Sequence, residues 1–148
     1  MTDKKQLVLL ETDVDDCTPE VLSYLMDRLF EEGALDVQFF SAVMKKGRPG
    51  YLVRVLSSVM LEEKLSGVLM EETGTLGVRV LPVLRRYTTR RQIIELEVEV
   101  SGVKEKIRVK KSPHNIKPEY DDVAQIARKH GLSYRRVLDL VDEVMVDF

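Results

Sequence analysis

The sequence has little of several residue types that build specialised proteins. Its 148 residues include one cysteine, Cys17, two histidines and no tryptophan. A single cysteine excludes an internal disulfide and a cysteine-rich zinc site. No apolar stretch approaches the ~20 residues that a membrane-spanning helix needs, and the N-terminus does not resemble a signal peptide. These absences predict a cytoplasmic protein that does not enter a membrane.

An excess of charge of one sign is also lacking. The 23 lysines and arginines nearly balance the 25 aspartates and glutamates, which leaves a net charge of −2. The chain as a whole is therefore not attracted to nucleic acid or to an anionic membrane, and any anion site must be local. Apolar residues make up 44% of the chain, which is ordinary for a globular domain and argues against disorder.

The first ninety residues alternate between strand and helix patterns. Four apolar or alternating runs predict strands, at residues 7–10, 37–43, 51–56 and 78–84. Apolar residues at helical spacing predict one helix after Thr18 and another after Ser58. Thr18 precedes Pro19, and a hydroxyl cap followed by proline favours a helix start. The order βαββαβ predicts a ferredoxin-like sandwich.

The remaining residues predict a smaller arrangement. Two strand-like runs flank Ser101 and Gly102, a pair typical of a tight hairpin turn. A polar loop follows, and then two short helices, one ending at Gly131 and one capped by Ser133. We therefore predict an α+β chain with a ferredoxin-like domain at residues 1–90. A β-hairpin and two short helices follow at residues 91–148 and are expected to pack with it as one unit.

An acidic cluster lies where the first strand should turn into the first helix. It consists of Glu11, Asp13, Asp15 and Asp16, which should repel one another. A hard divalent cation would relieve that repulsion, since Mg²⁺ and Mn²⁺ prefer carboxylate oxygen. The cluster is not an EF-hand, because Thr18 stands where the loop glycine is required. An exposed acidic turn that helps to cap the helix explains the same residues equally well.

A basic loop separates the second and third predicted strands. Lys45, Lys46 and Arg48 lie among glycine and proline in this loop. Backbone N–H groups beside glycine, together with a bidentate arginine, suit a phosphate group. On composition alone, a solvated loop between two strands is the favoured interpretation.

Two further segments have polar groups that suit a nucleotide. Residues 72–79 carry hydroxyls and glycines, although the glycines by themselves are best explained as a helix end. A second set of polar residues lies at Lys110, Lys111, Ser112, His114, Lys117, Glu119 and Tyr120. Its cations can meet phosphates and Tyr120 can stack on a base, but a polar loop and a helix start explain it too.

The last two predicted helices have the spacing of a helix-turn-helix. Arg135 and Arg136 stand where a recognition helix would begin. Asp139 and Asp142 follow them, however, and would repel the phosphates of DNA. We therefore do not expect nucleic acid to be a partner.

Four stretches, taken together and in order, resemble one protein family. They are LETDVDDCTPE at 10–20, MKKGRPG at 44–50, ETGTLGVR at 72–79 and PEYDD at 118–122. The set resembles the C-terminal region of the LarC family, the pyridinium-3,5-bisthiocarboxylic acid mononucleotide nickel insertion protein. The resemblance implies an enzyme that inserts Ni²⁺ into that mononucleotide, consuming CTP with Mg²⁺ or Mn²⁺, to make the cofactor of lactate racemase.

The resemblance also implies roles for matching residues. Asp13, Asp15, Asp16 and Glu11 become the candidate ligands of the divalent cation. The candidate nucleotide-binding residues are Lys45, Lys46, Arg48, Arg79, Lys117, Glu119 and Tyr120. No catalytic residue is assigned.

The family protein is longer than this chain and has an N-terminal region that these 148 residues do not include. Two histidines and one cysteine are too few for an obvious soft-ligand nickel site, so we expect nickel delivery to lie mostly in that region. We also expect a homo-oligomer. The alternative is a ferredoxin-like ligand-sensing or oligomerisation module without catalysis, because a fold does not fix a function.

Overall fold

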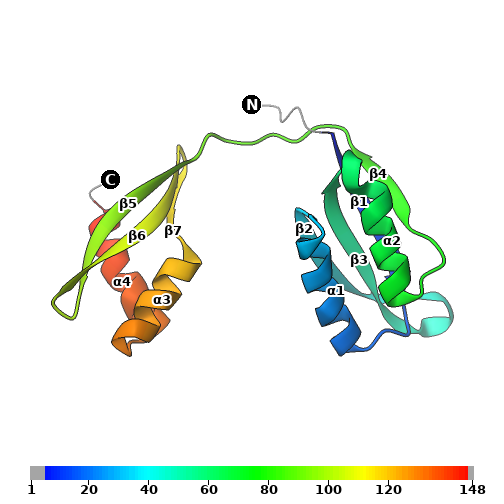
Figure 1. Ribbon diagram of the computed structural model, residues 1–148, viewed down its shortest axis with the longest axis horizontal. Helices are drawn as coiled ribbons and strands as arrows, with labels where there is room; N and C mark the ends of the chain where they lie inside the picture. Colours follow the sequence, from blue (N-terminus) through cyan, green and yellow to red (C-terminus); the bar gives the residue numbers. More distant parts are fainter. Residues whose placement is uncertain (1–5, 147–148) are drawn as a thin grey trace. The chain divides into compact units, whose positions relative to one another are not determined.

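The structure is a computed structural model that describes residues 6–146 (Figure 1). Along the chain lie two compact units, the first ending at Tyr87 and the second beginning at Thr88. Each unit has its own cluster of buried apolar side chains. The expectation that the two parts pack as one unit stays a prediction.

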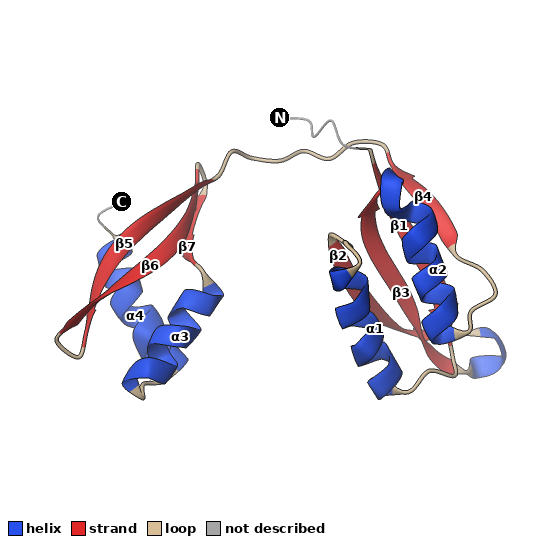
Figure 2. Cartoon of the chain, in the orientation of Figure 1, coloured by secondary structure: helices blue, strands red, loops and turns tan. Residues whose placement is uncertain are grey.

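The first unit is one sheet with two helices on one face (Figures 1 and 2). The strands are β1 (Leu7–Val14), β2 (Asp36–Val43), β3 (Pro49–Ser58) and β4 (Arg79–Val83), and the helices are α1 (Pro19–Glu31) and α2 (Glu62–Thr73). All neighbouring strands are antiparallel, in the order β2-β3-β1-β4. This is the ferredoxin-like arrangement, so the predicted fold class is confirmed.

Helix α1 begins as the sequence predicts, and α2 does not. The Thr18 hydroxyl accepts a hydrogen bond from the Val21 N–H at 3.4 Å, with Pro19 in the first turn. Ser58 makes no such bond, because a 3₁₀ turn at Val59–Leu61 comes between it and α2. Helix α2 ends at Gly74, whose φ of 69° is the left-handed conformation that glycine adopts without strain.

Strand β1 is longer than its apolar residues predict. It continues through the acidic residues, so Glu11 and Asp13 lie within the strand rather than in a turn. Their neighbours Leu10 and Val14 point to the helices and belong to the core. Because side chains alternate along a strand, Glu11 and Asp13 lie on the opposite face.

The second unit is a three-stranded antiparallel sheet with two helices. It contains β5 (Gln92–Val100), β6 (Val103–Ser112) and β7 (Asn115–Pro118), in that order, and α3 (Tyr120–His130) and α4 (Tyr134–Met145). Ser101 and Gly102 both have positive φ, 52° and 77°, as a tight hairpin turn requires. The Ser133 hydroxyl caps α4 by accepting a hydrogen bond from the Arg136 N–H at 3.2 Å. Strand β7 lies where the sequence analysis placed a loop.

Among the residues that the structure describes, no helix is long and apolar enough to cross a bilayer. In the second unit, alternate residues of β5 and β6, among them Val100 and Ile107, pack against the helices, which contribute Val137 and others to the core. The cytoplasmic location stays a prediction.

Candidate functional site

The acidic cluster and the basic loop meet at one edge of the first unit. Arg48 and Asp15 form an ion pair, with 3.2 Å between Nη1 and Oδ2. A hollow of about 480 Å³ is lined by Asp13, Asp15, Ala42, Val43, Met44, Lys45, Lys46 and Arg48. Carboxylates and cations far apart in the sequence therefore share one cavity.

The strand register explains why the basic loop lies beside the aspartates. Val14 at the end of β1 is opposite Tyr51 of β3, so the loop before β3 is carried to the start of the turn that leads to α1. The loop is tight: the Met44 N–H donates to the Arg48 carbonyl at 2.7 Å. Gly50 follows it, and a Cβ at that position would lie 2.6 Å from the Val14 carbonyl oxygen. Only glycine permits this approach of β3 to β1.

Arginine side chains pair with carboxylates of the acidic cluster and reduce the repulsion within it. Glu11 accepts from Arg54 of β3 at 2.7 Å, and Asp13 accepts from Arg79 of β4 at 2.7 Å. The hydrogen bond from Arg79 to Asp13 raises the pKa of the guanidinium. The four carboxylates thus point to separate partners or to solvent, and Glu11 does not line the hollow.

The fit to a divalent cation can be tested on the same residues. Within residues 6–146, no group of three or more histidine, cysteine, aspartate or glutamate side chains is arranged to hold a metal. Asp13 and Asp15 nevertheless line one hollow together with cationic side chains. Mg²⁺ is usually held by one or two carboxylates plus substrate phosphates and water. The site therefore fits a cation that arrives with a phosphate ligand, and not a cation bound by the protein alone.

The ion pairs differ in how easily a ligand can displace them. The side chain of Arg48 is 62% exposed, whereas those of Glu11 and Arg54 are 12% and 36% exposed. An exposed pair contributes only about 0–1 kcal/mol, because water screens it and both side chains lose freedom. A charged ligand can therefore separate Arg48 from Asp15 at little cost, while the pair of Glu11 and Arg54 belongs to the sheet.

The segment 72–79 lies beside the acidic cluster as well. Thr75 and Thr12 share a hydrogen bond of 2.6 Å, and the Thr12 hydroxyl is also 2.9 Å from the Gly77 carbonyl. These bonds tie the segment to β1. A second hollow, of about 590 Å³, is lined by Asp13, Asp15, Asp16, Thr75, Leu76, Gly77 and Arg79, with Thr12, Val14, Thr73 and Gly74. The segment is thus the helix end that its glycines predict, and it also forms a wall beside the aspartates.

Cys17 is a packed residue beside the site. It contacts the core of the first unit, and desolvation, followed by the charges of Asp16 and Asp15, raises the pKa of its thiol. A thiol that stays protonated is a poor nucleophile and a poor metal ligand. This is the environment of a small packed residue.

Three predicted nucleotide-binding residues belong to the second unit. Glu119 pairs with Lys110 at 2.7 Å, and the ring of Tyr120 lies 5.3 Å from that of Tyr134. Lys117 is exposed on β7. The structure gives these residues local partners or solvent, and their part in a nucleotide site stays a prediction.

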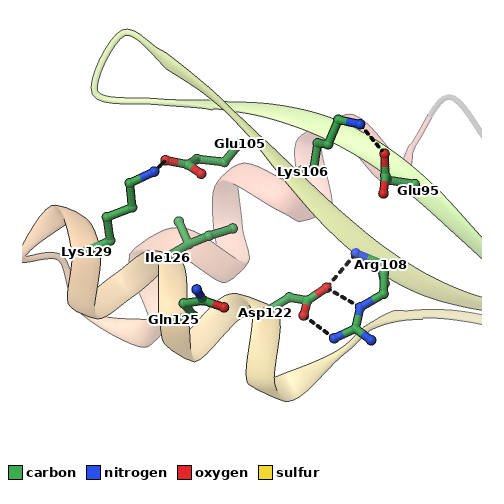
Figure 3. A pocket seen from close by; sticks show the side chains of 8 residues that line it. All are labelled: Glu95, Glu105, Lys106, Arg108, Asp122, Gln125, Ile126 and Lys129. Carbon is green, nitrogen blue, oxygen red and sulfur yellow. Dashed lines mark hydrogen bonds and ion pairs between the residues drawn. The ribbon is translucent and has the colours of Figure 1, made fainter.

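The second unit also has a charged hollow, of about 270 Å³, between β6 and α3 (Figure 3). Its cations are already paired: Lys106 with Glu95 at 2.8 Å, Arg108 with Asp122 at 2.5 Å and Lys129 with Glu105 at 2.6 Å. The bonds from Arg108 lower the pKa of Asp122, and those from Lys129 and His130 lower the pKa of Glu105. The pairs of Arg108 with Asp122 and of Lys129 with Glu105 fasten α3 to the sheet, and that of Lys106 with Glu95 joins β6 to β5.

Sequence reasoning did not single out Arg54 or the hydrogen-bonding role of Thr12. Both depend on strand register, which places Arg54 opposite Glu11. The spacing of Glu11 and Asp13, two residues apart, is a strand period and was the available signal.

The fold and the hollow define a class of protein: a ferredoxin-like α+β domain whose sheet edge presents carboxylates and cations to one cavity. The profile of a family described as Nickel insertion protein matches residues 1–138. The chain belongs to this nickel insertion protein family, and the resemblance carried by the four motifs is confirmed.

Several relatives are similar over nearly the whole chain. The pyridinium-3,5-bisthiocarboxylic acid mononucleotide nickel insertion protein of Acetivibrio thermocellus is 39% identical over 147 residues, which are 97% of this chain. Relatives from Dictyoglomus thermophilum and Methanothrix thermoacetophila are 37% and 42% identical, over 97% and 93% of it. The chain spans only 35–37% of the length of these curated relatives.

Two solved structures have a similar fold. One is the apo form of LarC2, described as the C-terminal domain of a cyclometallase involved in the synthesis of the NPN cofactor of lactate racemase. It matches with a TM-score of 0.82 and 33% identity over the whole of both chains. A crystal structure of a protein from Methanopyrus kandleri matches with a TM-score of 0.67 and 25% identity, over 93% of this chain and 86% of that one.

Proposed function

We propose that this chain is the CTP- and divalent-metal-binding domain of a nickel insertase. The insertase would place Ni²⁺, its substrate metal, into pyridinium-3,5-bisthiocarboxylic acid mononucleotide to make the nickel cofactor of lactate racemase. One observation carries the proposal: Asp13 and Asp15 line the same hollow as Lys45, Lys46 and Arg48. A nucleoside triphosphate with its cation carries both signs of charge and fits such a lining.

The carboxylates and the cations of the hollow would have different roles. Asp13 and Asp15, with Asp16 beside the second hollow, would hold Mg²⁺ or Mn²⁺. Lys45, Lys46 and Arg48 would neutralise the phosphates, and a guanidinium can bind two phosphate oxygens at once. When bound, the cation supplies further neutralisation of the triphosphate. Arg79, which now pairs with Asp13, is a secondary phosphate ligand.

Apolar side chains at the rim suit the nucleoside. Val43 is 82% exposed on the first hollow, and Leu76 is fully exposed on the second. Exposed apolar groups beside a charged cavity gain stability when a ring covers them. This arrangement supports a nucleotide more than inorganic phosphate.

The chain would act together with the N-terminal part of a longer protein and with further copies of itself. The chain covers about a third of its relatives, so nickel delivery is assigned to the N-terminal part of the longer protein. Association into a homo-oligomer is supported by apolar side chains on the sheet face opposite the helices, where Phe40 and Leu81 are 41% and 39% exposed. An oligomerisation or ligand-sensing module without catalysis is the alternative that this face favours. Such a module has no need of carboxylates beside a basic loop.

Calorimetry tests the proposal directly. The chain is titrated with CTP, ATP and GTP, with and without Mn²⁺, and the Asp13→Ala variant is titrated in parallel. We expect CTP to bind more tightly than ATP and GTP, with a metal-dependent affinity that the variant loses. Indifference to all three nucleotides would refute the proposal for this domain.

A further inference from the structure

Strand β5 forms an open edge of the sheet in the second unit (Figure 1). Since the strand order is β5-β6-β7, no strand within residues 6–146 pairs with its outer side. The strand has nine residues, whereas a strand usually has about five or six. Each residue from Gln92 to Val100 lies opposite one residue of β6, so no bulge twists the edge away. Such an edge offers a row of backbone groups to another chain.

The pairing with β6 shows which backbone groups of β5 point outward. The Arg108 N–H of β6 donates to Asp122 at 2.8 Å, and the Arg108 carbonyl accepts from the Glu119 N–H at 2.9 Å. The backbone of Arg108 therefore points away from β5. Glu95 lies opposite Arg108, so these two residues form a pair without mutual backbone hydrogen bonds. The N–H and carbonyl of Glu95 consequently point to the open side.

The same orientation recurs at every second residue of β5. It applies to Ile93, Glu97 and Glu99, because the direction of the backbone groups alternates along a strand. The hydrogen bonds formed among residues 6–146 give these outward groups no partner. They can therefore bond to an extended segment that lies beside β5.

The side chains of β5 determine which segment fits. Glu95, Glu97 and Glu99 form a row on the face away from the helices, since the alternate residues Leu96 and Val98 are buried in the core. The acidic row thus follows the open edge along most of its length.

The cations of β6 pair with this row from one side only. Lys106 pairs with Glu95 at 2.8 Å and Lys104 with Glu97 at 3.5 Å, and all four side chains are more than half exposed. Glu99 has no ion-pair partner in the described part of the chain. A carboxylate has two oxygens and can accept from cations on both sides. Cations on an added strand would therefore place each glutamate between two cations, which stabilises neighbouring strands.

A second copy of the same edge fits poorly. Pairing of two β5 strands with their buried faces on the same side would set the two glutamate rows against each other, and like charges opposite one another destabilise a sheet. The strand contains no proline, glycine or lysine that would block its edge, whereas the edge strand β4 of the first unit contains Pro82. The glutamates thus oppose self-pairing and favour a basic partner.

We infer that β5 binds, by strand addition, an extended segment of a partner protein in which basic and apolar residues alternate. Backbone hydrogen bonds to the outward groups supply the affinity, and the glutamate row supplies the specificity. The apolar side chains of the segment lie on the other face, toward α4, which packs against β5. This surface belongs to the second unit, so the inference does not depend on the nucleotide hollow of the first unit.

A seven-residue peptide with blocked ends, in which lysine and valine alternate, is the probe. The whole chain is titrated with it, and NMR measures both the affinity and the exchange rates of the backbone amides. At saturation we expect the amides of Glu95 and Glu97 to exchange at least tenfold more slowly. The amides of β2, an edge strand of the first unit, should change less than twofold. A peptide with glutamate in place of lysine should bind at least tenfold more weakly.

Three variants test the edge and its charge separately. Glu97→Pro removes an outward N–H, a position where proline breaks no bond of the sheet, and should lower the affinity at least tenfold. Glu97→Gln with Glu99→Gln keeps the backbone and should lower the affinity for the lysine peptide about fivefold. Asp142→Asn with Glu143→Gln removes the same charge from exposed positions of α4 and should change it less than twofold.

Several results would overturn the inference. They are no binding at millimolar peptide, equal affinities for the lysine and glutamate peptides, binding that leaves the β5 amides unprotected, and equal losses in the two double variants. A homo-oligomer that Glu97→Pro dissociates would also overturn it, because a second copy would then occupy the edge.

Discussion

Asp15 and Arg48 are 33 residues apart in the sequence, and 3.2 Å separates their side-chain oxygen and nitrogen atoms. The pair joins the turn after β1 to the loop before β3 at the mouth of the hollow. Because Arg48 is mostly exposed, the pair is weak and its partners are available to a ligand of mixed charge. A triphosphate would take the arginine, and its cation would take the aspartate.

Removing a cation from the basic loop should weaken the binding of the phosphates and leave the binding of the nucleoside unchanged. Lys46→Ala or Arg48→Ala should lower the affinity for CTP by about tenfold to a hundredfold, since a hydrogen bond to a charged group contributes about 1.5–3 kcal/mol. Cytidine affinity should change little. Calorimetry with both ligands measures the difference. Lys64→Ala is the control, because it removes a cation of α2 that pairs with Glu32, the residue after α1. Equal losses for CTP and cytidine would contradict a phosphate role for the loop.

Gly50 should be required for the approach of β3 to β1. Gly50→Ala brings a Cβ against the Val14 carbonyl oxygen and Met44 Sδ, and we expect it to destabilise the fold by about 1–3 kcal/mol. Gly67→Ala is the matched control, because its Cβ would meet open space within α2. That change should stabilise the fold by about 0.5–1 kcal/mol. Urea unfolding of both variants gives the two values, and a Gly50→Ala protein as stable as the wild type would show that the contact is unimportant.

The Cys17 thiol should report on the charge of the site. Its pKa is raised by desolvation and by Asp16 and Asp15, so alkylation by iodoacetamide should be slow at neutral pH. Asp15→Asn or Asp16→Asn should lower the pKa of the thiol and speed alkylation. Asp27→Asn, on the exposed side of α1, removes the same charge farther along the helix and should have less effect. Reaction rates measured against pH give the pKa of each variant, and identical rates would exclude the electrostatic contribution.

The second unit should lose stability in acid through Asp122. Hydrogen bonds from Arg108 lower the pKa of this carboxyl below its value near 3.9 in the unfolded chain. The resulting stability is fully present above the unfolded pKa and is lost as the pH falls through the folded pKa. Asp122→Asn should therefore be less stable than wild type at neutral pH, and the difference should shrink in strong acid.

Amide exchange of β6 and α3 residues measures that difference within the second unit. Asp121→Asn removes the exposed neighbouring carboxyl and serves as the control. A difference between Asp122→Asn and wild type that persists unchanged into strong acid would contradict the assigned linkage.

Local signals predicted several elements from sequence. The cap at Thr18 and the Ser101 and Gly102 turn act over a few residues, and both lie where the sequence places them. Strand β7 was missed because four residues become a strand only by pairing with β6. The extension of β1 was missed because acidic residues are depleted in strands; here arginines on β3 and β4 accommodate them.

The candidate site was predictable in its residue types but not in its geometry. The acidic cluster and the basic loop each have a composition that suits a cation or a phosphate, and the fold brings Asp15 to Arg48. The arginine partners of Glu11 and Asp13 depend on which strands lie beside β1. The sequence alone therefore does not show which charges oppose the acidic cluster, because strand order supplies them.

The most direct test of the central claim is a calorimetric titration of the Asp15→Ala variant with CTP, with and without Mn²⁺. If Asp15 both restrains Arg48 and holds the cation, the variant should bind CTP more tightly than wild type in the absence of metal. It should also lose the gain in affinity that Mn²⁺ gives the wild type. A variant that keeps the full Mn²⁺ gain, or that binds metal-free CTP more weakly than wild type, would contradict the account.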